Sequence, residues 1–289
     1  MSHSVTYTTG DGTSFDLTSL KYGLGSGAMW GSDLMTWEFD IDDTTGTTKR
    51  GSAEFDVTAR FKTKAEANDF ARATYADALT GKYGTLAVDG WQLSCNVKSG
   101  TPGQITDAGG ALCKLTLFSI DPTWRRITRH TLVAESGTQT STTGLDYPTD
   151  YEFDYAGTSR GSSMQSFHAD VPCSVRVTFY GPCTNPYVQV TSTTGRSTTS
   201  NYYGVDASAD AGERIVIDPM GRRSVGSSVY KVGAYGERTN LFDSRRRGVE
   251  GSGSYVFATM PAGDLMVSWP QGYAVDVETI EERGSLPWS

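Results

Sequence analysis

The chain has 289 residues, of which 37% are hydrophobic, and its formal net charge is −8 at pH 7. This length suggests one large domain or two ordinary ones. The acidic balance argues against nucleic-acid binding as the main function, because a nucleic-acid binder normally carries a basic patch or a basic domain.

No apolar run approaches the roughly 18 residues that a membrane-spanning helix needs, so the sequence predicts no transmembrane segment. The first residues lack the charged and apolar regions of a signal peptide, and we therefore expect the protein to be made and folded in a cytoplasm. The 33 glycines, together with the scarcity of long helical patterns, favour an all-β chain with many turns.

The chain begins with alternating apolar and polar residues, which is the pattern of half-buried strands. Residues 5–8 alternate and stop at residues 10–12, where Gly-Asp-Gly is a hairpin signal. Residues 34–41 and 51–61 also alternate, so one face of each strand is expected to be wet or available to a partner. The glycine-rich residues 23–27 are not followed by a helix, which argues against a phosphate-binding loop.

Residues 63–80 predict the one good helix of the chain. Thr63 and Glu66 have the spacing of a capping box, and Gly81 is placed to end the helix. Helical spacing predicts one largely apolar stripe, made of Ala67, Phe70, Ala71, Thr74, Ala78 and Leu79. We expect this stripe to cover a sheet face or the end of a barrel.

Strands return after the helix, at residues 84–88, 91–97 and 112–118, and the Gly-, Pro- and Asp-rich residues 99–110 predict a loop. The four cysteines include no Cys-x-x-Cys pair, which removes the strongest zinc and redox signatures. We expect them to be reduced in a cytoplasmic protein. Cys95 and Cys113 could face each other across a hairpin, and the sequence leaves open whether they are bridged.

The composition changes between residues 134 and 168, where small polar residues are followed by an aromatic stretch. We interpret this segment as a crossover linker between a first domain at residues 1–133 and a second at residues 169–289. In the second domain, runs of β-branched and aromatic residues predict strands in three places within residues 171–222. Further strands are predicted at residues 229–232, 255–259, 265–269 and 273–279. Residues 235–252 predict a long exposed loop.

Turn residues divide the strands of the second domain in a recognisable order. Gly181-Pro182 ends one strand, Asn185-Pro186 precedes the next, and a later strand reads Ile-x-Ile-Asp at residues 215–218. Pro261-Ala262-Gly263-Asp264 then leads into the last strands. This pattern resembles the galectin-like half of the distal tail proteins of long-tailed phages, and the first half of the chain resembles that family in its general layout.

The resemblance implies an all-β fold with one helix, in which an N-terminal β-barrel or split barrel is followed by a galectin-like β-sandwich. It also implies a structural virion protein that forms a hexameric ring at the tail tip and joins the tail tube to the baseplate. The implied partners are other copies of the chain, the tail tube protein, the tail-tip hub or tape-measure protein, and receptor-binding proteins. The ring would be assembled in the host bacterial cytoplasm, DNA would pass through it without specific binding, and no membrane would be involved.

The resemblance assigns no enzyme activity, catalytic residue, metal or cofactor. One group of residues is a candidate for contact between subunits, namely Arg245, Arg246 and Arg247 in the predicted exposed loop. Such a charge run usually lies on a solvated loop. Arginine also suits ion pairs at interfaces, so these residues could clamp acidic residues of a neighbouring subunit.

Two other classes of function stay open at this stage. The first alternative is a carbohydrate-binding module of a host-adhesion device, although the sequence does not provide the His-Asn-Arg-Trp constellation of galectins. The weaker alternative is a hydrolase in which His168, near Asp170, acts as the base, but a histidine of the linker is the simpler interpretation. The acidic turn at residues 40–46 departs from a calcium-binding loop and is interpreted as a solvated turn.

Overall fold

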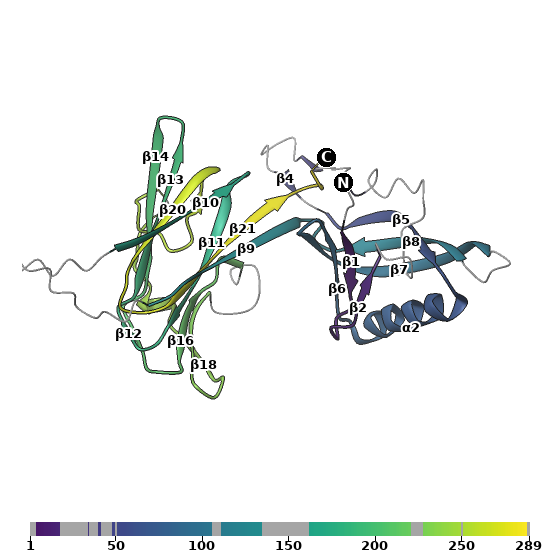
Figure 1. Ribbon diagram of the computed structural model, residues 1–289, viewed down its shortest axis with the longest axis horizontal. Coiled ribbons are helices and arrows are strands. Elements are labelled where there is room, and N and C mark those ends of the chain that lie inside the picture. The colour runs from purple at the N-terminus through teal and green to yellow at the C-terminus, as the bar shows by residue number, and fades with distance from the viewer. Residues whose placement is uncertain are drawn as a thin grey trace, which may run out of the picture. The chain divides into compact units, whose positions relative to one another are not determined.

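The computed structural model describes residues 4–17, 34, 40–41, 48–49, 51–105, 111–134, 162–220, 228–249 and 251–287. The chain divides into two compact units, the first formed by residues 1–127 with 282–289 and the second by residues 128–281 (Figure 1). The chain passes from one unit to the other inside two strands, β9 (Trp124–Leu132) and β21 (Val275–Arg283). The sequence-based division had placed residues 128–133 in the first domain and residues 282–289 in the second.

The first unit is built from antiparallel strands, and β9 meets β7 at Trp91 and Gln92, so that β7 takes part in three pairings. Its first part pairs with β6, and its second part pairs with β8. One edge continues from β6 to β1 and β2, and the other continues from β8 to β5. The bounds are β1 Val5–Thr8, β2 Ser14–Asp16, β5 Ala53–Phe61, β6 Gly84–Val88, β7 Trp91–Ile105 and β8 Ala111–Ser119, with a short pair β3 Asp40–Ile41 and β4 Thr48–Lys49.

The all-β class with one good helix is confirmed, and in the described part of the first unit the strands form open sheets with no closed barrel. The alternation predicted for residues 51–61 is present, because Phe55, Val57, Ala59 and Phe61 of β5 are all buried. The predicted loop at residues 99–110 was wrong for residues 99–105. They extend β7 because pairing with β8 continues past two irregularities in the register, which accommodate the Gly- and Pro-rich sequence.

Helix α2 (Lys64–Thr80) begins and ends where the sequence predicts. The amide of Glu66 donates to the Thr63 hydroxyl over 3.3 Å, and the amide of Thr63 donates to the Glu66 carboxylate over 3.0 Å. Gly81 ends the helix with a φ of 65°, a left-handed conformation that glycine adopts without a steric penalty. The capping box and the glycine cap are therefore confirmed.

The buried face of α2 differs from the predicted stripe. Phe70, Thr74 and Asp77 are buried, whereas Leu79 is exposed together with Ala71 and Ala78. The small alanine side chains of this helix hardly favour one buried face over another, so a single large side chain can set the orientation of the helix. Phe70 does so by packing edge-on against Tyr7 and Phe15, with ring centroids 5.7 and 5.1 Å away. Asp77 can be buried on this side because its carboxylate accepts the amide of Gly10 over 2.9 Å.

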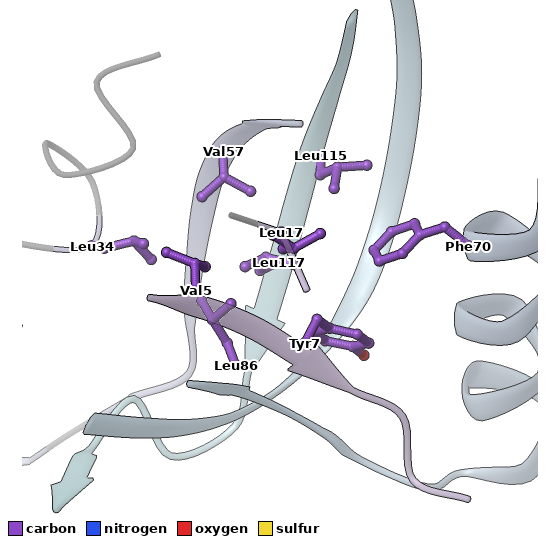
Figure 2. A pocket seen from close by; sticks show the side chains of 9 residues that line it. All are labelled: Val5, Tyr7, Leu17, Leu34, Val57, Phe70, Leu86, Leu115 and Leu117. Carbon is purple, nitrogen blue, oxygen red and sulfur yellow. The ribbon is translucent and has the colours of Figure 1, made fainter. Parts of the chain in front are cut away.

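A small void lies in the core of the first unit, between α2 and the strands (Figure 2). Nine side chains line it: Val5, Tyr7, Leu17, Leu34, Val57, Phe70, Leu86, Leu115 and Leu117. Its volume of about 10 Å³ is at the lower limit for one water molecule, and a lining that is almost wholly apolar offers too few hydrogen-bond partners for water. We therefore expect the void to be dry.

The second unit is a sandwich of two antiparallel sheets (Figure 1). One sheet has the order β10-β20-β13-β14, and the other contains β18-β17-β16-β11-β21. One continuous core joins them, since Val175, Val177, Val190 and Val267 are fully buried in the same cluster. The bounds are β10 Ser162–Ala169, β11 Cys173–Tyr180, β13 Tyr187–Thr194, β14 Ser197–Gly204, β16 Arg214–Ile217, β17 Val229–Val232, β18 Arg238–Asn240 and β20 Gly263–Pro270, with short pieces β12 Cys183–Thr184, β15 Ser208–Ala209 and β19 Thr259–Met260.

Several predicted boundaries of the second unit change in the structure. Residues 162–168 of the predicted crossover belong to strand β10, because residues 162–169 pair with β20 along their whole length. The predicted strand at 255–259 is mostly a turn, and only Thr259 begins a strand. Val256 and Phe257 of this turn are buried in the core of the second unit. The predicted loop at 235–252 contains β18 and a short 3-10 turn, η2 (Phe242–Ser244).

All four cysteines are buried and free of disulfide bonds. Cys113 lies opposite Pro102, and Asn96, next to Cys95, lies opposite Phe118. The register therefore separates Cys95 from Cys113 along the hairpin, which removes the possible bridge. Among the described residues, no helix is long and apolar enough to cross a membrane.

Candidate interaction surfaces

The exposed side of α2 in the first unit carries large apolar side chains. Tyr75 is 65% exposed and Leu79 is 70% exposed. Ala71 and Ala78 lie beside them at helical spacing, so the four residues Ala71, Tyr75, Ala78 and Leu79 form one line, which we call the helix stripe. Grouped apolar side chains on a protein surface are typical of sites that bind another molecule.

The helix stripe rests on a well-anchored helix. The ring of Phe70 packs against Tyr7 and Phe15, with ring centroids 5.7 and 5.1 Å away, and the carboxylate of Asp77 accepts the Gly10 amide. The exposed ion pair between Arg72 and Asp69, 2.8 Å long, lies beside the stripe and contributes little to stability. Because its inner side is fixed, the helix can present the stripe in one orientation to a partner.

The candidate contact residues Arg245, Arg246 and Arg247 have different surroundings. Arg245 donates to the carbonyl of Phe242 and lies over its ring, 3.7 Å from the centroid. Arg246 pairs with the Asp206 carboxylate over 3.3 Å and lies 5.1 Å from the centroid of the Tyr187 ring.

Arg247 has only a long ion pair, 3.5 Å from Asp243, and both side chains are largely exposed. Within the described part of the chain, the first two arginines therefore serve contacts inside the second unit. Arg247 is the member of the run that is best placed to meet a partner.

His168 lies on strand β10, opposite Asp264 of β20. Its Nδ1 is 2.8 Å from the Asp264 carboxylate and its Nε2 is 3.7 Å from that of Asp170. The hydrogen bond with Asp264, together with the neighbouring carboxylates, raises the pKa of His168 above its usual value. The His168 side chain is 61% exposed, so this cluster lies on an open surface and lacks the water-poor surroundings of a typical acid–base site.

The other histidine among the described residues, His130, has surroundings different from those of His168. His130 stacks on Phe167 with ring centroids 4.0 Å apart, and burial lowers its pKa. Among the described residues, no group of three or more His, Cys, Asp or Glu side chains could hold a metal ion. His3 and most of the acidic turn at 40–46 lie outside the described residues.

An ionic face covers the outer side of β11 and β21 in the second unit, and we define it by Arg129, Arg176, Tyr180, Asp276 and Glu278. The guanidinium of Arg176 is 2.9 Å from Glu278, and that of Arg129 pairs with Asp276. Burial raises the pKa of Asp276, but the hydrogen bonds that it accepts from Arg129 and Tyr180 outweigh burial and lower the pKa overall. Sequence reasoning missed this face, because its members come together only through strand register.

A different surface covers the outer side of the other sheet. We call it the tyrosine face and define it by Tyr187, Gln189, Thr191, Ser200 and Tyr202. The Gln189 amide donates to the Ser200 hydroxyl over 2.7 Å, and the Thr191 hydroxyl lies 3.0 Å from the same oxygen. The rings of Tyr187 and Tyr202 are neighbours, with centroids 6.1 Å apart. The alternation of residues 187–190 was the signal that could have pointed to this face.

No protein-family model matches the sequence, and no curated protein sequence matches it either. Solved structures do match it. A chain of the phage P2 baseplate in its activated conformation with calcium is 14% identical, with a TM-score of 0.50 over 99% of this chain and 100% of that chain. The strontium form of that baseplate gives 13% identity and a TM-score of 0.49 over 98% of this chain and 99% of that one.

The Dit protein of phage SPP1, described as a hub of the adsorption apparatus in phages that infect Gram-positive bacteria, is also similar. It is 11% identical, with a TM-score of 0.46 over 96% of this chain and 99% of that chain. The match to the calcium form of the P2 baseplate chain shows that this chain has the same fold along its length. That fold agrees with the all-β architecture predicted from the resemblance to distal tail proteins.

Proposed function

We propose that this protein is a structural subunit of the tail tip of a long-tailed phage, of the distal tail protein type. The observation that carries the proposal is the fold shared with a phage baseplate chain over 99% of this chain and 100% of that one. A full-length match includes both compact units, so the proposal does not depend on one common domain. Fold alone does not define function, and the surfaces of the two units supply the further support.

In this proposal the first unit forms a hexameric ring that continues the tail tube. A closed ring needs heterologous contacts, in which two different patches of each subunit meet. The helix stripe has the properties of one such patch, because Tyr75 and Leu79 are 65% and 70% exposed on an anchored helix. Residues 34–41 and 51–61 would lie in the same ring.

The second unit would contact the other components of the tail tip. The proposed partners are the tail tube protein, the tail-tip hub or tape-measure protein, and receptor-binding proteins. The exposed Arg247 is the residue of the arginine run that could pair with an acidic group on a neighbouring chain. The protein would assemble in the host cytoplasm and work in the virion by contact between subunits, without a chemical reaction, a cofactor or specific binding of the DNA that passes through the ring.

The test is the oligomeric state of the purified protein and of helix-stripe variants, measured by light scattering on a size-exclusion column and by negative-stain microscopy. We expect sixfold rings for the wild type. Leu79→Asp places a charge in the stripe and should shift the protein to monomers. Ala76→Asp is the matched control, because it makes the same kind of change at an exposed position of the same helix outside the stripe.

The ring would be refuted if the purified wild type stays monomeric at every concentration and tail tips isolated from virions contain no ring of this protein. Rings that resist Leu79→Asp would keep the ring and remove the helix stripe from its interface. Equal dissociation by Leu79→Asp and Ala76→Asp would show that the helix, and not the stripe, had been damaged.

A further inference from the structure

The tyrosine face consists of rows of side chains that run across the sheet β10-β20-β13-β14. One middle row contains Ser166, Met266, Thr191 and Ser200, and the next contains Ser268, Gln189 and Tyr202. Side chains opposite each other in an antiparallel pair point to the same side of the sheet, so these residues share one surface. Their polar groups are hydroxyls and a carboxamide.

The charged groups of this surface lie at its two ends and are paired there. At one end His168 contacts Asp264. At the other end Arg246 pairs with Asp206 and covers part of Tyr187. The described strand residues of the two middle rows carry no formal charge. A strongly charged partner would therefore find no complementary charge in the centre of the surface.

The aromatic part of the surface is held in place from below. The Tyr273 hydroxyl accepts the amide of Tyr187 over 2.8 Å and donates to the Tyr187 carbonyl over 2.7 Å. Burial raises the pKa of Tyr273 to about 12, so it stays a neutral donor at physiological pH. The amide of Tyr202 donates to the carbonyl of Gly253 over 2.8 Å, which fixes the edge strand β14.

Close packing beside Tyr187 depends on Gly204. A Cβ atom at position 204 would lie 2.9 Å from Cδ of Arg246 and 3.0 Å from Cβ of Tyr187. Glycine leaves the space in which the Arg246 side chain lies over the Tyr187 ring. The ring is thus pre-positioned, which lowers the entropy lost when a ligand binds.

We propose that the tyrosine face binds a neutral glycan. An exposed tyrosine ring gives an apolar platform for the C–H face of a sugar ring, and the phenol supplies a hydrogen bond at its edge. The side chains of Gln189, Thr191 and Ser200 can donate to and accept from sugar hydroxyls. Tyr202, which is 39% exposed, is the platform residue, and Tyr187 with Arg246 closes one side of the site.

The chemistry of the surface favours a glycan over a protein partner. Protein interfaces concentrate their binding energy in a dry apolar centre, whereas here one apolar side chain, Met266, which is 37% exposed, lies among hydroxyls and an amide. Anionic polymers need unpaired cations, and Arg246 is already paired with Asp206. A neutral polyol matches both properties, because it offers many hydroxyls and no charge.

The test is affinity electrophoresis and calorimetry of the full chain with neutral polysaccharides (dextran, starch and a galactomannan) and oligosaccharides of glucose, galactose and N-acetylglucosamine. Polygalacturonate serves as the anionic comparison. We expect saturable binding to at least one neutral glycan, and this binding should change little with salt. Tyr202→Ala should weaken it about tenfold or more, and Tyr202→Phe should keep most of it.

Tyr235→Ala is the matched control, because Tyr235 is 98% exposed at the turn between β17 and β18, away from the tyrosine face. It should leave the affinity within about twofold of the wild type. The proposal is overturned if no neutral glycan retards the protein, if Tyr202→Ala binds as the wild type does, or if the anionic polymer alone binds. It is also overturned if Tyr202→Ala changes only the oligomeric state, which would make the face a contact between copies. The helix-stripe variants test the ring separately, so either proposal can fail alone.

Discussion

The two units use their apolar residues in different ways. In the second unit the large apolar side chains fill the space between two sheets, and the outer faces carry ion pairs or neutral polar groups. In the first unit one helix covers the strands with Phe70, Thr74 and Asp77, and it turns Tyr75 and Leu79 outward. The second unit also exposes large apolar residues, among them Tyr235 in a turn and Val249 in a loop, whereas in the first unit Tyr75 and Leu79 lie together on one helix, in a line that a neighbouring molecule could cover.

The difference extends to how each core is closed. Phe70 makes the main aromatic contact of α2, with three rings within 5.7 Å, and it also lines the void of the first unit. The core of the second unit is closed by many residues from both sheets, including Phe179, which packs against Tyr273. The loss of the Phe70 side chain should therefore destabilise the first unit and leave the core of the second unit intact.

The largest expected effect comes from Phe70→Ala. Removing a buried aromatic side chain beside an existing void should lower the free energy of unfolding of the first unit by about 3–5 kcal/mol. Urea denaturation followed by fluorescence and by limited proteolysis should show an early transition whose cleavage sites fall within residues 1–127. Phe179→Ala is the comparison, and its early cleavage sites should fall within residues 128–281. Identical early cleavage patterns for the two variants would show that the units do not unfold separately.

The second effect sharpens the account of the ionic face. Asp276 is 2% exposed and accepts hydrogen bonds from Arg129 and Tyr180. Asp276→Asn keeps the shape of the side chain but removes its charge, so we expect the free energy of unfolding of the second unit to fall by about 1–3 kcal/mol at neutral pH. Asp206→Asn is the control, because that carboxylate is largely exposed and its ion pair contributes little.

The contribution of the Asp276 carboxylate to stability depends on pH in a definite direction. The pKa of Asp276 is lowered in the folded protein, so its contribution is present above the unfolded pKa near about 4 and is lost as the pH falls through the folded value. Acid unfolding of the wild type and of Asp276→Asn should therefore converge at low pH. A difference that persists unchanged at the lowest pH would contradict the charge-based account.

The sequence predicted those parts of the molecule that depend on local chemistry. The capping box of Thr63 and Glu66, the cap at Gly81 and the alternation in β5 follow from neighbouring residues, and all are present. Long-range pairing decided the rest. The helix turned Leu79 outward because the core accepted Phe70, and β7 ran through a Gly- and Pro-rich stretch because β8 paired with it.

The candidate surfaces show the same limit. Arg176 and Glu278 are far apart in sequence, and only the register of β11 with β21 makes them neighbours. Tyr187 and Tyr202 likewise meet through the pairing of β13 with β14. The arginine run at 245–247 was visible in the sequence, but its division into two arginines with contacts inside the unit and one exposed arginine depends on Phe242, Tyr187 and Asp206.

A smaller effect tests the packing of the tyrosine face. Gly204→Ala brings a Cβ atom within 3.0 Å of Cβ of Tyr187 and displaces Arg246. We therefore expect the free energy of unfolding to fall by about 1 kcal/mol and glycan binding to weaken. Gly272→Ala is the matched control in the same unit, because a Cβ atom there meets nothing within 4 Å. Equal stability of the two variants in urea denaturation would show that the neighbours of Gly204 can move aside freely.

The smallest effect concerns His168, and its sign is opposite to that of Asp276. The pKa of His168 is raised by Asp264 first and by Asp170 and Glu281 as well. Its contribution is therefore fully present below the unfolded pKa of about 6.5 and is lost as the pH rises through the folded value.

His168→Gln should lower the melting temperature by at most about 2 °C near pH 5, because the pair is exposed to solvent, and the difference should shrink as the pH rises through the raised pKa of His168. Asp264→Asn should behave in the same way, since it removes the main partner of the imidazolium. A deficit that grows toward alkaline pH would show that neutral His168 is the stabilising form. The ion pair between β10 and β20 would then contribute nothing to the sandwich.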